Sequence, residues 1–258
     1  MKVEELGSHI PIRDLEEEVW VPAKIEFIEM LPATHVLGKA KRIEGESGNR
    51  IIVEEQRIMP ILAFPEKKGE FALTLHDTNP EEEPAPYYLN FRNLPAEVTK
   101  LIALAMAETV ETNFFEDVDY LVGVPDSAIV IAKELSRITG IPCLEVLGKN
   151  KNKDIFPQNS NDKWHGNVCL VEDIFTKATN AIKAAKAIRS LGFNTIKALA
   201  AVDREQGGIY NSRQEGIEGQ AVTTISEIFN HLYDKEKLGA ADYNILTSYV
   251  ARHRPLIA

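Results

Sequence analysis

Residues 167–192 read NVCLVEDIFTKATNAIKAAKAIRSLG and begin with an apolar run that is typical of a strand buried on both faces. From position 179 the apolar residues recur at helical spacing, and Gly192 marks the end of the helix. The loop between strand and helix is polar and starts with Glu172 and Asp173. A strand, a loop and a helix in succession are the repeating unit of a parallel α/β sheet.

The same alternation extends to both sides of this stretch. It starts at Pro95, which suits the first turn of a helix. We expect helices over 95–112 and 127–140, and buried strands over 119–125, 143–147, 167–171 and 195–203. Strands and helices that alternate at this spacing predict an α/β fold, with a parallel sheet flanked by helices.

Composition excludes several classes of protein. The chain has 258 residues, of which 44% are hydrophobic and 26% charged, so it is neither disordered nor fibrous. Its formal net charge of -10 repels the phosphate backbone of nucleic acids, so we expect no nucleic-acid partner. The start of the chain lacks a signal-peptide pattern, and no apolar run has membrane-spanning length, so we expect no membrane association. Cys143 and Cys169 lie in apolar runs, which favours buried, reduced thiols and a cytoplasmic location. Their spacing is not that of metal ligands, so we expect no metal ion bound by the protein alone.

The first quarter of the chain differs from the rest in its pattern of apolar and polar residues. WVPAKIEFIEM (20–30), THVLGKAKRI (34–43) and NRIIVEEQRI (49–58) are short, partly alternating runs typical of β structure. We therefore expect a small β-rich extension over residues 1–65 and a main domain over 66–258 that ends in a helix. Residues 79–86 are acidic and rich in proline, which predicts a surface loop.

Polar residues at the ends of the predicted strands are the candidates for chemistry, because ligands of open α/β sheets bind at the carboxyl ends of the strands. Glu172 and Asp173 lie at such an end, just before a helix N-terminus that favours anions. Adjacent carboxylates there suit sugar hydroxyls or a magnesium-bound ligand. The same pattern also fits a polar turn that ends a buried strand.

The segment VCLVEDIFTKATNA (168–181) resembles the phosphoribosyl pyrophosphate (PRPP) motif of type I phosphoribosyltransferases. Glu172, Asp173 and Thr176 match the motif, whereas Ala178 stands where the family has glycine. The resemblance implies that the two carboxylates hold the ribose hydroxyls and that residues 176–180 hold the 5′-phosphate. The implied PRPP contacts in this segment are Glu172, Asp173, Ile174, Phe175, Thr176, Lys177, Ala178, Thr179 and Asn180.

Two further segments are similar to orotate phosphoribosyltransferases in particular. DREQGG (203–208) resembles a segment whose arginine binds the orotate carboxylate, so the resemblance assigns that contact to Arg204. PYYLNFR (86–92) is similar to the family's SPYYxxLR segment, and an upstream lysine of the family is replaced here by Thr74. The resemblance places Thr176, Arg204 and Tyr88 at the orotate site.

GVPDSAIVIA (123–132) resembles the family's turn that meets pyrophosphate, and a lysine-rich stretch follows it at 149–153. The implied pyrophosphate contacts are Val124, Pro125, Asp126, Ser127, Lys149, Lys151 and Lys153. Lys151 aligns with the family's catalytic lysine, and Asp173 is the second residue for which a catalytic role is implied. A run of lysines is also typical of a solvated loop.

The resemblance extends in the family's order from about Gly69 to Leu238. It implies transfer of a phosphoribosyl group from PRPP to orotate, with Mg²⁺ carried by PRPP and a homodimer as the assembly. Two alternatives remain open at this point. One is a protein that binds PRPP or a nucleotide as a sensor, favoured by the changes at Thr74, Leu147 and Ala178, and the other is a transferase for another base.

Overall fold

A four-stranded parallel sheet forms the centre of the fold, and three of its strands coincide with predicted apolar runs. The computed structural model describes residues 22–65, 71–72, 74–77, 79–110, 114–152, 154–158 and 165–255. The sheet has the order β10-β9-β8-β5, and every neighbouring pair is parallel. Its strands are β5 (Tyr120–Gly123), β8 (Asn167–Phe175), β9 (Asn194–Asp203) and β10 (Glu218–Thr224). The predicted α/β class is confirmed.

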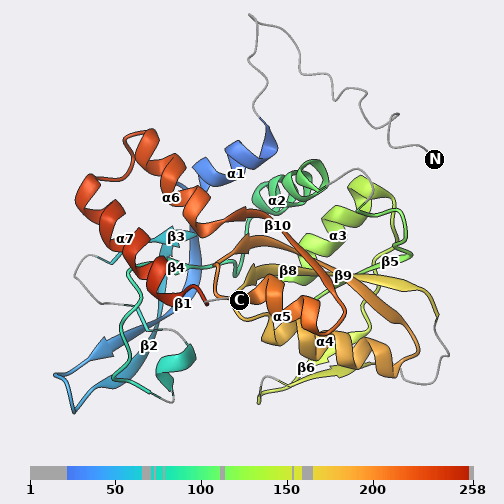
Figure 1. Ribbon diagram of the computed structural model, residues 1–258, viewed down its shortest axis with the longest axis horizontal. Helices are drawn as coiled ribbons and strands as arrows, with labels where there is room; N and C mark the ends of the chain where they lie inside the picture. The colour runs from blue at the N-terminus through green and yellow to red at the C-terminus, as the bar shows by residue number, and fades with distance from the viewer. Residues whose placement is uncertain are drawn as a thin grey trace, which may run out of the picture.

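Helices cover both faces of this sheet (Figure 1). α2 (Ala96–Thr109) and α3 (Ala128–Thr139) lie on one face, and α4 (Thr179–Ser190) and α5 (Gly208–Gln214) lie on the other. Side chains of β8 alternate between the two cores: Cys169 joins the core under α2 and α3, and Leu170 joins the one under α4. Burial on both faces explains the continuous apolar run of this strand. None of the described helices is long and apolar enough to cross a membrane.

A second lobe, at the left of Figure 1, combines the N-terminal segment with the C-terminal helices. Its elements are α1 (Ala23–Met30), β1 (His35–Glu44), β2 (Ile51–Pro60), β3 (Leu62–Ala63), the 3-10 helix η2 (Thr74–Asp77), β4 (Tyr88–Leu89), α6 (Ile225–Asp234) and α7 (Ala240–His253). β1 and β2 form an antiparallel ribbon, and β3 pairs with β4. The domain boundary after residue 65 stays a prediction.

Two local predictions were wrong. The β-type run over 20–30 is the helix α1 from Ala23 onward, because Pro22 precedes its first turn and Phe27 and Ile28 pack into the core. The predicted sheet strand over 143–147 contributes only a single bridge, between Cys143 and Leu121 at the sheet edge. The chain then forms a separate antiparallel hairpin from β6 (Leu147–Lys149) and β7 (Ile155–Pro157).

Candidate active site

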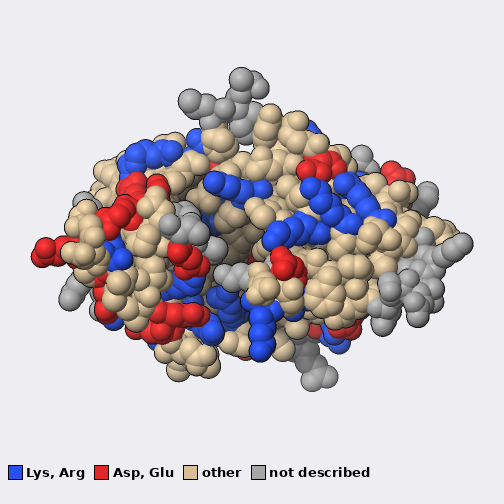
Figure 2. All heavy atoms as spheres, turned by 90° about the horizontal axis from the view of Figure 1, so that it is seen from below, with Lys and Arg blue, Asp and Glu red and all other residues tan. Residues whose placement is uncertain are grey.

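A cavity of about 900 Å³ lies between the carboxyl ends of β5, β8 and β9 and the ribbon formed by β1 and β2. Figure 2 shows a hollow in the surface with Lys and Arg side chains around it. The charged residues that line the cavity are Lys39, Lys41, Glu54, Arg92, Asp126, Lys149, Glu172, Asp173, Lys177 and Arg204. The strand ends singled out from the sequence therefore meet at one place.

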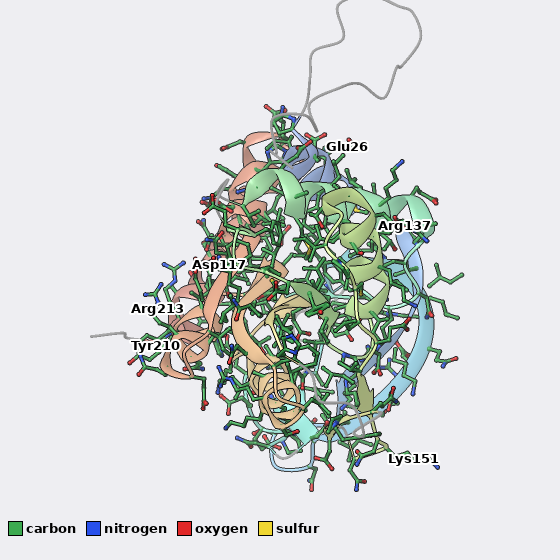
Figure 3. The ribbon with its side chains drawn as sticks, turned by 90° about the vertical axis from the view of Figure 1, so that its right-hand side faces the viewer. Glu26, Asp117, Arg137, Lys151, Tyr210 and Arg213 are labelled. Atoms are coloured by element: carbon green, nitrogen blue, oxygen red, sulfur yellow. The ribbon has the colours of Figure 1, made fainter. Side chains whose placement is uncertain are left out.

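The structure places most, but not all, of the predicted site residues on this cavity. Tyr88, Pro125, Asp126, Ser127, Lys149, Glu172, Asp173, Ile174, Thr176, Lys177, Thr179, Asn180 and Arg204 line it. Val124, Phe175 and Ala178 are buried in the core behind it. Lys151 is exposed in the turn after β6, at the periphery of the molecule (Figure 3), and Lys153 lies outside the described residues.

The acidic pair at the end of β8 has two different environments. Asp173 accepts hydrogen bonds from the Ser127 hydroxyl at 2.6 Å and from the Ile174 N–H at 2.7 Å. Glu172 is only 6% exposed, and its Oε2 has no hydrogen-bond partner among the described residues. Burial, reinforced by the neighbouring Asp173, raises the pKa of Glu172 well above its ordinary value. An unpaired carboxyl oxygen at a cavity wall is suited to a hydroxyl of a ligand.

The loop after this pair contains no glycine, but its residue Ala178 has a backbone conformation that favours glycine. Ala178 has φ 56° and ψ 22°, the left-handed region, and α4 begins directly after it. Gly208 packs against this loop so closely that a Cβ atom there would lie 2.9 Å from the Thr176 carbonyl oxygen. The Asn211 side chain also donates to the Lys177 carbonyl at 3.0 Å. The loop at 176–180 is thus supported from the segment that follows Arg204.

Replacing Ala178 by glycine tests this backbone. A left-handed conformation costs a residue with a Cβ atom about 1–2 kcal/mol, which glycine avoids. We expect Ala178→Gly to preserve or raise the affinity for PRPP, measured by calorimetry. The matched control is Ala181→Gly inside α4, where glycine lowers the melting temperature without such relief. Weaker PRPP binding by Ala178→Gly would show that the loop depends on the buried methyl group.

A basic side chain lies beside the turn at 124–127. The Lys149 ammonium group donates to the Pro125 carbonyl at 3.2 Å and to the Asp126 carboxylate at 3.4 Å. Its side chain is 17% exposed, whereas Asp126 is largely exposed. Lys149 is therefore held at the cavity in this structure, and Lys151 would reach it only if the β6–β7 hairpin moved.

Arg204 lies on the cavity wall with part of its guanidinium group unused. It is 6% exposed, and its Nε donates to the Tyr87 hydroxyl at 3.0 Å. Its guanidinium carbon lies 4.6 Å from the centre of the Tyr87 ring. The buried Nη2 has no hydrogen-bond partner within the described part of the chain. A buried cation with a free donor favours an anionic ligand, and the planar fork of arginine suits a carboxylate.

The pKa of Asp203, at the end of β9, predicts that the stability of the fold depends on pH. Burial, with the nearby Glu205 charge, outweighs the hydrogen bond from the Glu205 N–H and raises the pKa of Asp203 to about 6 from an ordinary value of 3.8. The folded state then binds more protons than the unfolded state between about pH 4 and pH 6, so this group makes unfolding easier as the pH rises through that window. We expect the melting temperature of Asp203→Asn, relative to wild type, to rise between pH 4 and pH 7. A difference that does not vary with pH would contradict the raised pKa.

Several residues that line the cavity or support its wall were not predicted from the sequence. Tyr87 is fully buried and supports Arg204, while Lys39 and Lys41 reach the cavity from the β1–β2 ribbon. Both lysines form ion pairs, Lys39 with Glu54 at 3.2 Å and Lys41 with Asp77. Their positions could have been predicted from the sequence, because residues two apart on a strand point to the same face of the sheet.

Comparisons with known proteins agree on one family, although no protein-family model matches the chain. The chain is 27% identical over 191 residues to the orotate phosphoribosyltransferase of Staphylothermus marinus, which covers 73% of this chain and 89% of the relative. It is 30% identical over 169 residues to that of Pyrococcus horikoshii, covering 63% of this chain and 86% of the relative.

Solved structures show the same fold. UMP synthase from Leishmania donovani superposes with a TM-score of 0.59 at 17% identity, covering 74% of this chain and 40% of that longer chain. Orotate phosphoribosyltransferase from Mycobacterium tuberculosis superposes with a TM-score of 0.51 at 19% identity, covering 81% of this chain and 99% of the other. Because a relative at 30% identity is matched over most of its length and the fold agrees, this chain belongs to the orotate phosphoribosyltransferase family.

Proposed function

We propose that this protein transfers the phosphoribosyl group of PRPP to orotate, giving orotidine 5′-monophosphate and pyrophosphate. The observation that carries the proposal is Arg204, a buried arginine with an unpartnered Nη2 on the wall of the cavity that also holds Glu172 and Asp173. The guanidinium group would bind the orotate carboxylate through two parallel hydrogen bonds. The carboxylates would bind the ribose hydroxyls of PRPP. The names of the matched relatives support this choice of substrates.

The reaction forms one bond and breaks one. A ring nitrogen of orotate bonds to C1 of the ribose, and the bond from C1 to the pyrophosphate oxygen breaks, so its electron pair leaves with pyrophosphate. The attacking ring nitrogen must also lose its proton, and orotate that binds with this nitrogen already ionised has released the proton to solvent, so no side chain would be required to remove it. The protein's tasks are to align the two substrates and to stabilise charge on the leaving group.

Cations at the cavity would stabilise that charge. Lys149 already lies beside the turn at 124–127, and we propose that Lys151 and Lys153 join it when the hairpin closes. Lys177 and the N-terminus of α4 would face the 5′-phosphate. Closure would also exclude water from the reacting carbon.

Mg²⁺ is the proposed companion of PRPP. Among the described residues no group of three His, Cys, Asp or Glu side chains could hold a metal ion, but Asp126, Glu172 and Asp173 offer carboxylate oxygens to the cavity. The ion would be carried by PRPP, and these carboxylates would place negative charge beside it. When bound, it would neutralise charge on the pyrophosphate.

We further propose a homodimer, a cytoplasmic location, and no nucleic-acid or membrane partner. The net charge of -10 supports the absence of a nucleic-acid partner. The homodimer and the location are expectations from the family, and sedimentation and fractionation of the native protein test them.

Release of pyrophosphate from PRPP in the presence of Mg²⁺ tests the proposed activity. The panel contains orotate, uracil and purine bases, with a reaction lacking a base as control. We expect release with orotate alone. Release with another base would overturn the choice of substrate but not the reaction. If no base gave release and PRPP still raised the melting temperature, the protein would be a sensor and not an enzyme.

A further inference from the structure

Arg204 is held by an aromatic cluster to which the C-terminal helix contributes. Tyr87 accepts its Nε hydrogen bond and lies under its guanidinium group. The Tyr87 ring packs edge-on against Phe229 of α6, with ring centres 5.2 Å apart, and against Tyr249 of α7, with ring centres 6.0 Å apart. Since Tyr87 is fully buried, its position is fixed by these two helices.

Tyr249 links this cluster to the end of α7. It is 1% exposed and stacks on His253, with ring centres 4.0 Å apart. One residue before His253, α7 is also anchored to the segment that precedes Tyr87, because Arg252 forms an ion pair with Glu83. The helix therefore contacts the segment that carries Tyr87 and Tyr88 at two points.

The end of the chain also holds the loop that carries Arg204. Glu205 has φ 58°, so the backbone directly after Arg204 is in the left-handed region. One carboxylate oxygen of Glu205 accepts from the Ser226 N–H at 3.1 Å and from the Ser226 hydroxyl, and the other pairs with Arg254. Pro255 lies against Gly207, so a Cβ atom at Gly207 would be 3.0 Å from its ring.

We infer that α7 and the two residues after it position Arg204 for recognition of the carboxylated base, acting through Tyr87 and through Glu205. This inference deepens the proposed function and rests on it. Tyr87 contacts the guanidinium group, Tyr249 acts through Tyr87 and Arg254 acts through Glu205, so all three are positioning residues. Two parallel hydrogen bonds to a carboxylate demand a fixed guanidinium plane, which a free arginine side chain does not have.

The contacts predict which kinetic constant changes. Loss of a positioning residue should weaken orotate binding much more than PRPP binding, since Asp173 keeps its hydrogen bond from Ser127 and the loop at 176–180 keeps its hydrogen bond from Asn211 on α5. A residue needed only for the fold would alter both. The Michaelis constants for the two substrates therefore separate positioning from general stability.

The experiment compares Tyr87→Phe and Arg254→Ala with wild type. Tyr87→Phe keeps the ring and removes the acceptor of the Arg204 Nε–H, and we expect the KM for orotate to rise about tenfold. Arg254→Ala removes an exposed ion pair, and we expect a rise of about two- to fivefold, reversed in Arg254→Lys. The KM for PRPP should stay within about twofold of wild type in each variant.

Two matched controls and one double variant complete the test. Tyr120→Phe changes a residue at the amino end of β5. Arg137→Ala removes an exposed ion pair with Glu134 on α3 (Figure 3). Both variants should leave the two constants unchanged. In the Arg204→Ala background, Tyr87→Phe should cause no further loss, because its effect passes through Arg204. Additive losses, or equal changes in both KM values, would overturn the inference. If the wild-type protein did not turn over orotate, the proposed function would be overturned together with this inference. If the wild-type protein turned over orotate and both variants kept its KM for orotate, this inference alone would be overturned.

Discussion

Arg204→Ala is expected to reduce the affinity for orotate by about 2–3 kcal/mol, roughly 30- to 150-fold. Hydrogen bonds from a charged group contribute this much, and the Nη2 of Arg204 is buried without a partner within the described residues. The KM for PRPP should stay near that of wild type, because the Arg204 side chain donates to Tyr87 whereas Asp173 is held by Ser127. Steady-state measurement of pyrophosphate release, with each substrate varied in turn, gives both constants.

Two further variants make this result specific. Arg204→Lys keeps the positive charge and loses the planar fork, so its affinity for orotate should lie between those of wild type and Arg204→Ala. Arg213→Ala removes an exposed arginine of α5 that points away from the molecule (Figure 3), and it should change neither constant. If Arg204→Ala turned over orotate like wild type, the carboxylate contact would have to lie elsewhere in the cavity.

The sequence was sufficient for β5, β8 and β9 because these strands are largely buried on both faces, whereas the less buried β10 was not predicted. Such strands give continuous apolar runs, and β8 and β9 were found on that basis. The same reasoning failed at 143–147, where an apolar run lies at the sheet edge and makes one bridge. It also failed at α1, whose short run of apolar and charged residues fits a helix and a strand equally well.

The candidate site was predictable to the extent that it lies at strand ends. Glu172, Asp173 and Arg204 all follow apolar runs, and parallel strands bring their carboxyl ends to one edge. The contact of Arg204 with Tyr87 joins residues 117 positions apart, and the contact of Glu205 with Arg254 depends on where α7 packs. No local pattern encodes such contacts, because they arise from tertiary packing.

Asp173→Asn is expected to lower kcat/KM for PRPP by roughly 100-fold, which corresponds to about 3 kcal/mol of lost transition-state stabilisation. The aspartate already accepts from Ser127 and from the Ile174 N–H, and it lines the cavity beside Glu172. Asparagine has nearly the same shape, but one of its two oxygens becomes an N–H donor and its negative charge is lost. A ribose hydroxyl or a magnesium ion brought by PRPP would then lose an anionic acceptor.

The effect should be one of binding and catalysis and not of folding. Asp173 is half-buried, and asparagine can keep the Ile174 hydrogen bond, so the melting temperature should change little. Asp117→Asn is the matched control, because Asp117 is exposed ahead of β5, at the opposite end of the sheet (Figure 3), and we expect it to behave as wild type. A normal kcat/KM in Asp173→Asn would mean that Glu172 alone holds the ribose.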